Sequence, residues 1–311
     1  MTRSQRSLDA SELDLWVPTN EEVQALHEEG DAAEQDDSES ERDLPELLTA
    51  QCHTLLRRYG GVILRGPPGT GKSYLANLIA EGLTNEPDRL YRIQFHPSYQ
   101  YEDFVQGFQP TEEGGFSLAD RTLRLACQKA TEDPNNVVVL LIDELSRVDC
   151  ARVFGEAFTY LERSKRGMGF YLPSGSFMSI PSNVAVIGTM NDRDIGVDAL
   201  DAALERRFAM IELLPSETEL VSILSNSTLS PEERSKVLAF FREANAGADG
   251  GIGLGHAYFY GIRDLTDLQD LWDHQLRFVL RRALTLDPDR HAQLVSLWPT
   301  TPKHGAGASL S

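Results

Sequence analysis

The sequence contains few cysteines, no long hydrophobic run and no excess of basic residues. Its three cysteines, Cys52, Cys127 and Cys150, are odd in number and lack the spacing of a metal site, which indicates a reduced, cytoplasmic protein. No stretch approaches the roughly 20 apolar residues that a membrane helix needs, and residues 1–15 lack the apolar core of a signal peptide. We therefore expect a cytoplasmic protein with no membrane segment and no disulfide framework.

The net charge is negative and unevenly distributed. The chain carries a formal charge of −19, and residues 1–46 contain 15 acidic against 3 basic side chains. Residues 28–43 are almost devoid of large apolar side chains, so we expect residues 1–46 to form an acidic, largely disordered tail. Because nucleic-acid-binding surfaces are normally basic, we expect DNA contact to be at most indirect, or through the pore of an assembly.

The remaining residues predict two domains of different class. Between residues 47 and 215, the apolar runs GGVILRG, NVVVLLIDE and NVAVIGTMN alternate with helical patterns, which is typical of an α/β parallel sheet sandwiched by helices. Residues 216–290 have a helical pattern, and Ser230, Pro231 and Glu233 carry the capping-box signature of a helix start. We expect a small all-α lid domain there, followed by a flexible tail over residues 291–311.

The segment GPPGTGKS, residues 66–73, fits the P-loop pattern and lies between a predicted strand and a predicted helix. In this pattern glycines let backbone N–H groups surround phosphates, and the helix N-terminus adds partial positive charge. Lys72 is expected to reach the β- and γ-phosphates, and the Ser73 hydroxyl to bind Mg²⁺. The expected nucleotide-binding residues are Gly66, Pro67, Pro68, Gly69, Thr70, Gly71, Lys72, Ser73 and Tyr74.

Two further predicted strands end in polar side chains that suit nucleotide hydrolysis. The run VVVLLIDE ends in Asp143 and Glu144, and ligands of parallel sheets bind at the carboxyl ends of the strands. We expect Asp143 to support the Mg²⁺ shell and Glu144 to act as general base on the attacking water. Asn191 ends the following strand, where its amide can orient that water; the alternative is a turn-forming asparagine.

A pair of arginines, Arg206 and Arg207, precedes the strand-like segment AMIELL. One of them could neutralise transition-state charge on the nucleotide of a neighbouring subunit, as arginine fingers do. Alternatively, both are solvated surface residues.

Taken in order along the chain, these motifs resemble those of AAA+ NTPases. The segment FHPSYQYEDFVQGFQP, residues 95–110, is similar to the stretch that marks the McrB-like branch, the motor subunits of McrBC-type modification-dependent restriction systems. The segments IDELSRVDCARVFGEAFTYLE, YLPSGSFMSIPSNVAVIGTMN and GLGHAYF resemble that branch as well. We expect the aromatic residues Phe95, Tyr99, Tyr101 and Phe104 to pack internally, with Tyr101, Glu102 and Asp103 near the site or a subunit interface.

The resemblance implies a ring, expected to be a hexamer, in which Arg206 or Arg207 completes the neighbouring subunit's site. It also implies a separate McrC-like nuclease partner that stimulates hydrolysis. Known members of the branch prefer GTP and read MNTADR where this chain reads MNDRD, so we expect ATP, with GTP as the alternative. A second departure is Ser146, which stands where the family usually has asparagine.

The basic residues of segment 163–177 and the histidine His256 each allow two interpretations. Residues 163–177 resemble a hairpin with Arg163, Lys165 and Arg166 at its turn, where the basic side chains either are solvated or face a pore. His256, in GLGHAYF, either touches the nucleotide or is a structural histidine.

Two other functions fit the same P-loop chemistry. A MoxR-like chaperone would remodel a protein partner, although residues 95–110 favour the McrB-like branch over it. A nucleotide-binding switch would turn over little nucleotide, although the presence of Lys72, Asp143, Glu144 and Asn191 favours hydrolysis.

Overall fold

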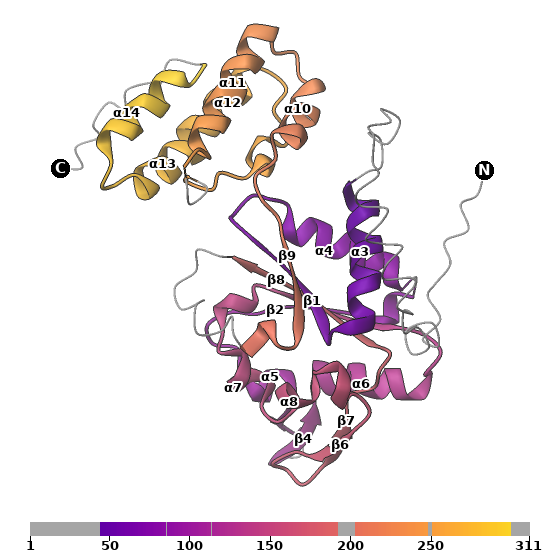
Figure 1. Ribbon diagram of the computed structural model, residues 1–311. Helices are drawn as coiled ribbons and strands as arrows, with labels where there is room; N and C mark the ends of the chain where they lie inside the picture. Colours follow the sequence, from indigo (N-terminus) through magenta and orange to yellow (C-terminus); the bar gives the residue numbers. More distant parts are fainter. Residues whose placement is uncertain (1–43, 85, 113, 192–202, 248–250, 300–311) are drawn as a thin grey trace, which may run out of the picture. The chain divides into compact units, whose positions relative to one another are not determined.

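The computed structural model describes residues 44–84, 86–112, 114–191, 203–247 and 251–299 (Figure 1). The chain divides into two compact units. Among the described residues, the sheet unit contains those of 44–65 and 72–212, and the helical unit contains those of 66–71 and 213–299. The acidic tail expected over residues 1–46 lies, up to residue 43, outside the described residues. Within the described ranges, no helix has the length and apolar character needed to cross a membrane.

The sheet unit is built on five strands in the order β2-β5-β8-β1-β9. The pairs β2–β5, β5–β8 and β1–β9 run parallel. The three predicted apolar runs became β1, β5 and β8, which are buried along nearly their whole length because helices cover both faces of the sheet. The predicted α/β class is confirmed. The strands are β1 Gly61–Gly66, β2 Leu90–Gln94, β5 Val138–Asp143, β8 Val184–Asn191 and β9 Phe208–Glu212.

Helices cover the sheet (Figure 1), and packed aromatic rings complete the core of this unit. Phe95 and Phe104 are fully buried and meet edge to face, with ring centroids 5.5 Å apart, and Phe154 packs 4.8 Å from Phe104. These rings join Phe95 and Phe104 to the core, and Tyr99 and Tyr101 pack against it, which confirms the packing expected for these four aromatic residues. The helices are α3 Leu44–Arg58, α4 Lys72–Leu83, α5 Tyr101–Phe104, α6 Thr122–Glu132, α7 Cys150–Phe154 and α8 Ala157–Tyr160.

Two antiparallel hairpins leave this core, β3 Gln106–Pro110 with β4 Phe116–Asp120 and β6 Gly169–Tyr171 with β7 Phe177–Ser179. The β6–β7 hairpin was predicted from residues 163–177, but Arg163, Lys165 and Arg166 precede β6 and do not lie at the turn between the two strands.

Arg166 instead lies before β6 and donates hydrogen bonds to the carbonyl oxygens of Gly60, Leu161, Pro181 and Val184. The expectation of a cluster at the turn was therefore wrong, because the backbone carbonyls at the base of the hairpin bind this guanidinium.

The helical unit has its own apolar core. Its last helix contradicts the flexible tail predicted from residue 291, because Leu294 is fully buried and Trp298 stacks on Trp272 with centroids 5.1 Å apart. Ordered structure thus continues to residue 299, and only residues 300–311 of that tail lie outside the described residues. The helices are α10 Glu217–Ser225, α11 Pro231–Ala244, α12 Leu265–Leu271, α13 Arg277–Ala283 and α14 Pro288–Leu297, with a π-helical turn over Trp272–Leu276.

Candidate active site

The carboxyl ends of β5 and β8 place polar side chains beside the start of α4. Asp143 is the last residue of β5, Asn191 is the last residue of β8, and Lys72 and Ser73 open α4. This is the edge at which parallel sheets bind ligands. A cavity of about 270 Å³ lies beside Ser73 and Asp143, so a small ligand has room there.

Ser73 and Asp143 are joined directly. The Ser73 hydroxyl donates to the Asp143 carboxylate, with Oγ 2.9 Å from Oδ1 and 3.2 Å from Oδ2. The Thr189 hydroxyl, two residues before the end of β8, donates to Asp143 Oδ1 as well. The expected Mg²⁺ ligands are therefore in contact across 70 residues of sequence.

Glu144 follows Asp143 in a left-handed backbone conformation, with φ 62° and ψ 46°. Among the described residues it is the one non-glycine residue with positive φ, a conformation that is costly for a side chain with Cβ. Its carboxylate accepts from Asn191 Nδ2 at 3.2 and 3.4 Å. Its other partner is Arg147, whose Nε is 3.3 Å from Oε2. The turn thus brings the expected base and the expected water-orienting amide together.

The phosphate-loop residues Gly66–Gly71 group with the helical unit. Gly69 has φ 79°, and a Cβ there would lie 2.7 Å from the ring of Tyr258, so glycine is required for both backbone and space. The Ala257 N–H donates to the Gly69 carbonyl at 2.8 Å. Thr70 is buried and donates to the Pro67 carbonyl at 3.0 Å, which stabilises the curl of the loop.

Other predicted contacts of this loop differ in exposure. The Lys72 side chain is buried, whereas Pro68 and Tyr74 are exposed, Tyr74 by 62%.

His256 has a backbone partner. It is 6% exposed, and its Nδ1 accepts the N–H of Ser216 at 3.2 Å, so its proton resides on Nε2. Burial lowers the pKa of His256 below its ordinary value, which keeps the ring neutral. The structural interpretation of this histidine is supported by these contacts.

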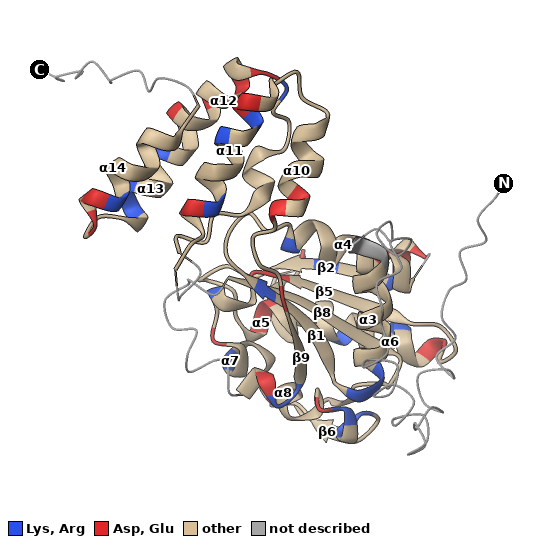
Figure 2. Ribbon diagram, turned by 45° about the horizontal axis from the view of Figure 1, so that its top comes forward, with Lys and Arg blue, Asp and Glu red and all other residues tan. Residues whose placement is uncertain are grey.

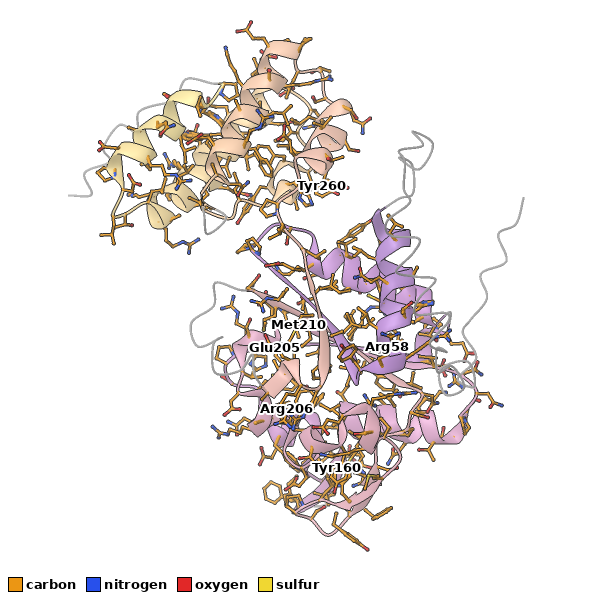
Figure 3. All side chains as sticks on the ribbon, in the orientation of Figure 1. Arg58, Tyr160, Glu205, Arg206, Met210 and Tyr260 are labelled. Carbon is orange, nitrogen blue, oxygen red and sulfur yellow. The ribbon has the colours of Figure 1, made fainter. Side chains whose placement is uncertain are left out.

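Arg206 and Arg207 have different surroundings. Arg207 donates to the carbonyls of Phe158 at 2.8 Å and Ala203 at 2.7 Å, and its guanidinium lies 4.2 Å from the centroid of the Phe158 ring. Arg206 is exposed and lies next to Glu205 at the turn before β9 (Figure 3). Of the two, Arg206 has the geometry of a side chain that can reach another molecule.

Thr189 and Arg147 were not identified from the sequence. Thr189 could have been found, because side chains two residues apart on a strand share a face, and Asn191 already indicated which face of β8 meets the site. Arg147 gave no comparable signal, since its contact depends on the unusual turn at Glu144. Residues 192–202, with the rest of MNDRD, lie outside the described residues.

The oxygen atoms present fit Mg²⁺ bound together with a nucleotide. Among the described residues, no group of three or more His, Cys, Asp and Glu side chains could hold a metal alone. Mg²⁺ does not need three such protein ligands, because it usually binds one or two protein oxygens and completes its shell with phosphates and water. The Ser73 hydroxyl and the Asp143 carboxylate supply oxygens of that kind.

Comparisons with known proteins point to one group. Residues 61–208 match the AAA domain (dynein-related subfamily). The chain is 33% identical over 244 residues to the Type IV methyl-directed restriction enzyme EcoKMcrB subunit of Escherichia coli K12, covering 72% of this chain and 53% of that protein. It is 29% identical to the Type II restriction enzyme BsuMI component YdiS of Bacillus subtilis, covering 47% and 55%.

The chain thus spans about half the length of these two curated relatives. The domain match, the identity to the McrB subunit and the five-stranded parallel sheet agree with the motifs of the sequence. Together, these similarities and the fold support a McrB-like AAA+ protein.

Proposed function

We propose that the chain is a Mg²⁺-dependent nucleoside triphosphatase that uses ATP, with GTP as the alternative substrate. The observation that carries the proposal is the continuous hydrogen-bonded cluster formed by Ser73, Asp143, Thr189, Glu144 and Asn191. A nucleotide switch without turnover needs the phosphate loop but not a carboxylate base paired with an amide.

Each side chain has a role in this proposal. The loop and Lys72 bind the phosphates, and Ser73 and Asp143 would hold Mg²⁺, which neutralises charge on the phosphate oxygens when bound. Glu144 accepts a proton from the attacking water at its carboxylate, and Asn191, 3.2 Å from that carboxylate, orients the same water. The buried surroundings of Lys72 and Thr189 strengthen these electrostatic contacts.

The test is phosphate release from ATP and GTP in parallel, across a protein concentration series, with Glu144→Gln as the variant. Removing the base should lower turnover by about 100-fold or more, while fluorescent-nucleotide binding stays unchanged because the phosphate contacts are intact. Lys72→Ala should lose binding itself. Normal turnover in Glu144→Gln would show that the base is assigned wrongly.

We further propose a ring, expected to be a hexamer, in which Arg206 acts on the neighbouring subunit's nucleotide. Support comes from the exposure of Arg206 and from the internal contacts that occupy Arg207. An exposed cation at a subunit boundary can stabilise the charge that develops during phosphoryl transfer.

Mixing two inactive variants tests this arrangement. Arg206→Ala subunits retain Glu144, and Glu144→Gln subunits retain Arg206, so a 1:1 mixture should rebuild complete sites at about a quarter of the interfaces of a closed ring. The matched control replaces Glu144→Gln by the double variant Glu144→Gln/Arg206→Ala, which should restore nothing. Absence of recovery in the first mixture would contradict action between subunits.

A McrC-like nuclease is the proposed partner, and DNA restriction the proposed setting. Support comes from the relatives, which are named as a subunit and a component of restriction enzymes. Basic and acidic residues are interspersed along the ribbon of the described sheet unit (Figure 2), which suits a motor that reaches DNA indirectly or through a pore. The proposed location is cytoplasmic, in keeping with three free, buried cysteines.

A further inference from the structure

We infer that Thr189 is the positioning residue of the proposed site: its hydroxyl holds the metal-binding carboxylate of Asp143 and the backbone turn of Glu144 in one arrangement. This inference rests on the proposed function and deepens it. Thr189 itself touches neither nucleotide nor water in this scheme, and acts through the two acids.

One hydroxyl group makes both contacts. Thr189 is 2% exposed, and a hydroxyl has one proton to donate and lone pairs to accept. Its proton goes to Asp143 Oδ1, and its oxygen accepts the N–H of Glu144 at 3.1 Å. Asp143 at the end of β5 and Glu144 in the following turn are thereby both hydrogen-bonded to the Thr189 hydroxyl oxygen of β8.

The backbone of Glu144 needs such a partner. The parallel register between β5 and β8 runs from Val138–Val184 to Ile142–Gly188, so the N–H of Glu144 lies beyond that ladder. At the same point the chain enters the left-handed conformation, which an ordinary residue adopts only where surrounding contacts hold it. The Thr189 hydroxyl supplies the partner that the ladder does not.

The same strand face also positions the side chain of Glu144. Thr189 and Asn191 are two residues apart on β8 and share a face. Thr189 holds the Glu144 backbone, and Asn191 contacts its carboxylate. Ser73 and Thr189 meanwhile donate to the same Asp143 carboxylate. Removing the Thr189 hydroxyl should therefore disturb metal binding and base placement together, without changing the phosphate loop.

The experiment compares Thr189→Ser with Thr189→Ala in the full chain. Both variants lose the same methyl group, so their difference isolates the hydroxyl. Three quantities are measured: kcat and KM for phosphate release, the Mg²⁺ concentration that half-saturates its enhancement of fluorescent-ATP binding, and metal-free binding of the same nucleotide. Thermal melting of each variant reports folding.

For Thr189→Ala we expect kcat to fall about 10- to 100-fold relative to Thr189→Ser, and the half-saturating Mg²⁺ concentration to rise about tenfold, as for other residues that orient metal ligands. KM at saturating Mg²⁺ and metal-free binding should stay within about twofold, since the phosphate contacts are retained. Thr189→Val, which keeps the shape without the hydroxyl, should behave like Thr189→Ala.

Equal losses in the serine and alanine variants would overturn the inference, because the methyl group rather than the hydroxyl would then matter. Wild-type behaviour of Thr189→Ala would overturn it too. If the wild-type protein hydrolyses nothing, the proposed function fails, yet the Mg²⁺ response of nucleotide binding still separates the two variants. A difference there supports the role of Thr189 toward Asp143, and no difference overturns it.

Discussion

At the scale of single residues, the two adjacent arginines before β9 illustrate how neighbours in sequence diverge in role. Arg207 satisfies two backbone carbonyls and lies over the Phe158 ring, with its side chain 15% exposed. Arg206, one position earlier, is exposed. A stability assay and an activity assay should therefore rank the two substitutions in opposite orders.

We predict that Arg207→Ala lowers the free energy of unfolding by about 2 kcal/mol, because two carbonyls lose their donor. Arg206→Ala should stay within about 0.5 kcal/mol of the wild type, as surface substitutions usually do. Urea midpoints followed by far-UV circular dichroism measure both. Equal midpoints for the two variants would mean that the Arg207 contacts add nothing to stability.

Much of the candidate site could be predicted from sequence because its residues sit at fixed positions relative to strand ends. Asp143 and Asn191 close buried apolar runs, and Lys72 and Ser73 follow a glycine-rich loop, so their convergence follows from parallel strand order. The partner of each arginine could not be predicted in the same way. That choice depends on carbonyls such as Phe158, which are distant in sequence and leave no pattern.

At the scale of elements, the start of α11 could be predicted from residues that are close together in the sequence. Ser230 accepts from the Glu233 N–H at 3.3 Å, and the Glu233 carboxylate accepts from the Ser230 N–H at 2.7 Å. Both contacts lie within four residues, so the predicted capping box is confirmed.

Ser230→Ala should lower the free energy of unfolding by about 1 kcal/mol, because the first turn of α11 loses its cap. The matched control is Ser222→Ala, an exposed position inside α10, where alanine is the better helix former and should change stability by less than about 0.5 kcal/mol. Thermal melting of the two variants provides the comparison. A larger loss at Ser222 than at Ser230 would contradict the capping role.

Elements without such a signal were missed. In the β3–β4 hairpin, Phe108 and Phe116 are 71% and 75% exposed. Its aromatic residues therefore do not mark a buried face, and the strands could not be recognised from an alternation of buried and exposed residues. Helix α14 offers few buried side chains, with Leu294 the fully buried one. Its start could have been found from Asp287, which caps the helix by accepting from the Arg290 N–H at 3.0 Å, and from Pro288 at the first position.

At the scale of the whole molecule, the chain passes between its two units more than once. Gly66–Gly71 leave the sheet unit and group with the helical residues, and Leu213 begins the second crossing into that unit. The single boundary predicted between residues 215 and 216 lies three residues after the later crossing, and it leaves the crossing at the loop out. Sequence periodicity cannot reveal this, because six loop residues have no periodicity.

Within the sheet unit, Arg166 connects segments that are far apart in the chain. We predict that Arg166→Lys lowers the free energy of unfolding by about 2–3 kcal/mol, since an ammonium cannot reach four carbonyls at once and would be buried with fewer partners. Burial already lowers the pKa of the Arg166 guanidinium to about 10. The measurement is the urea midpoint of the sheet unit, with Arg163→Lys as the comparison at a guanidinium that bonds the Ser182 carbonyl.

The contacts of Arg166 also bear on the order of folding. Its bond to Gly60 closes a separation of 106 residues, and such a loop is closed late because its entropy must be lost before the contact forms. Burying the guanidinium before β1 and β8 lie side by side would leave a charge without partners. Arg166 should thus be unbonded in the folding transition state, so its replacement accelerates unfolding and leaves the folding rate nearly unchanged. We therefore expect Arg166 to affect the lifetime of the folded sheet and not the rate at which the sheet forms.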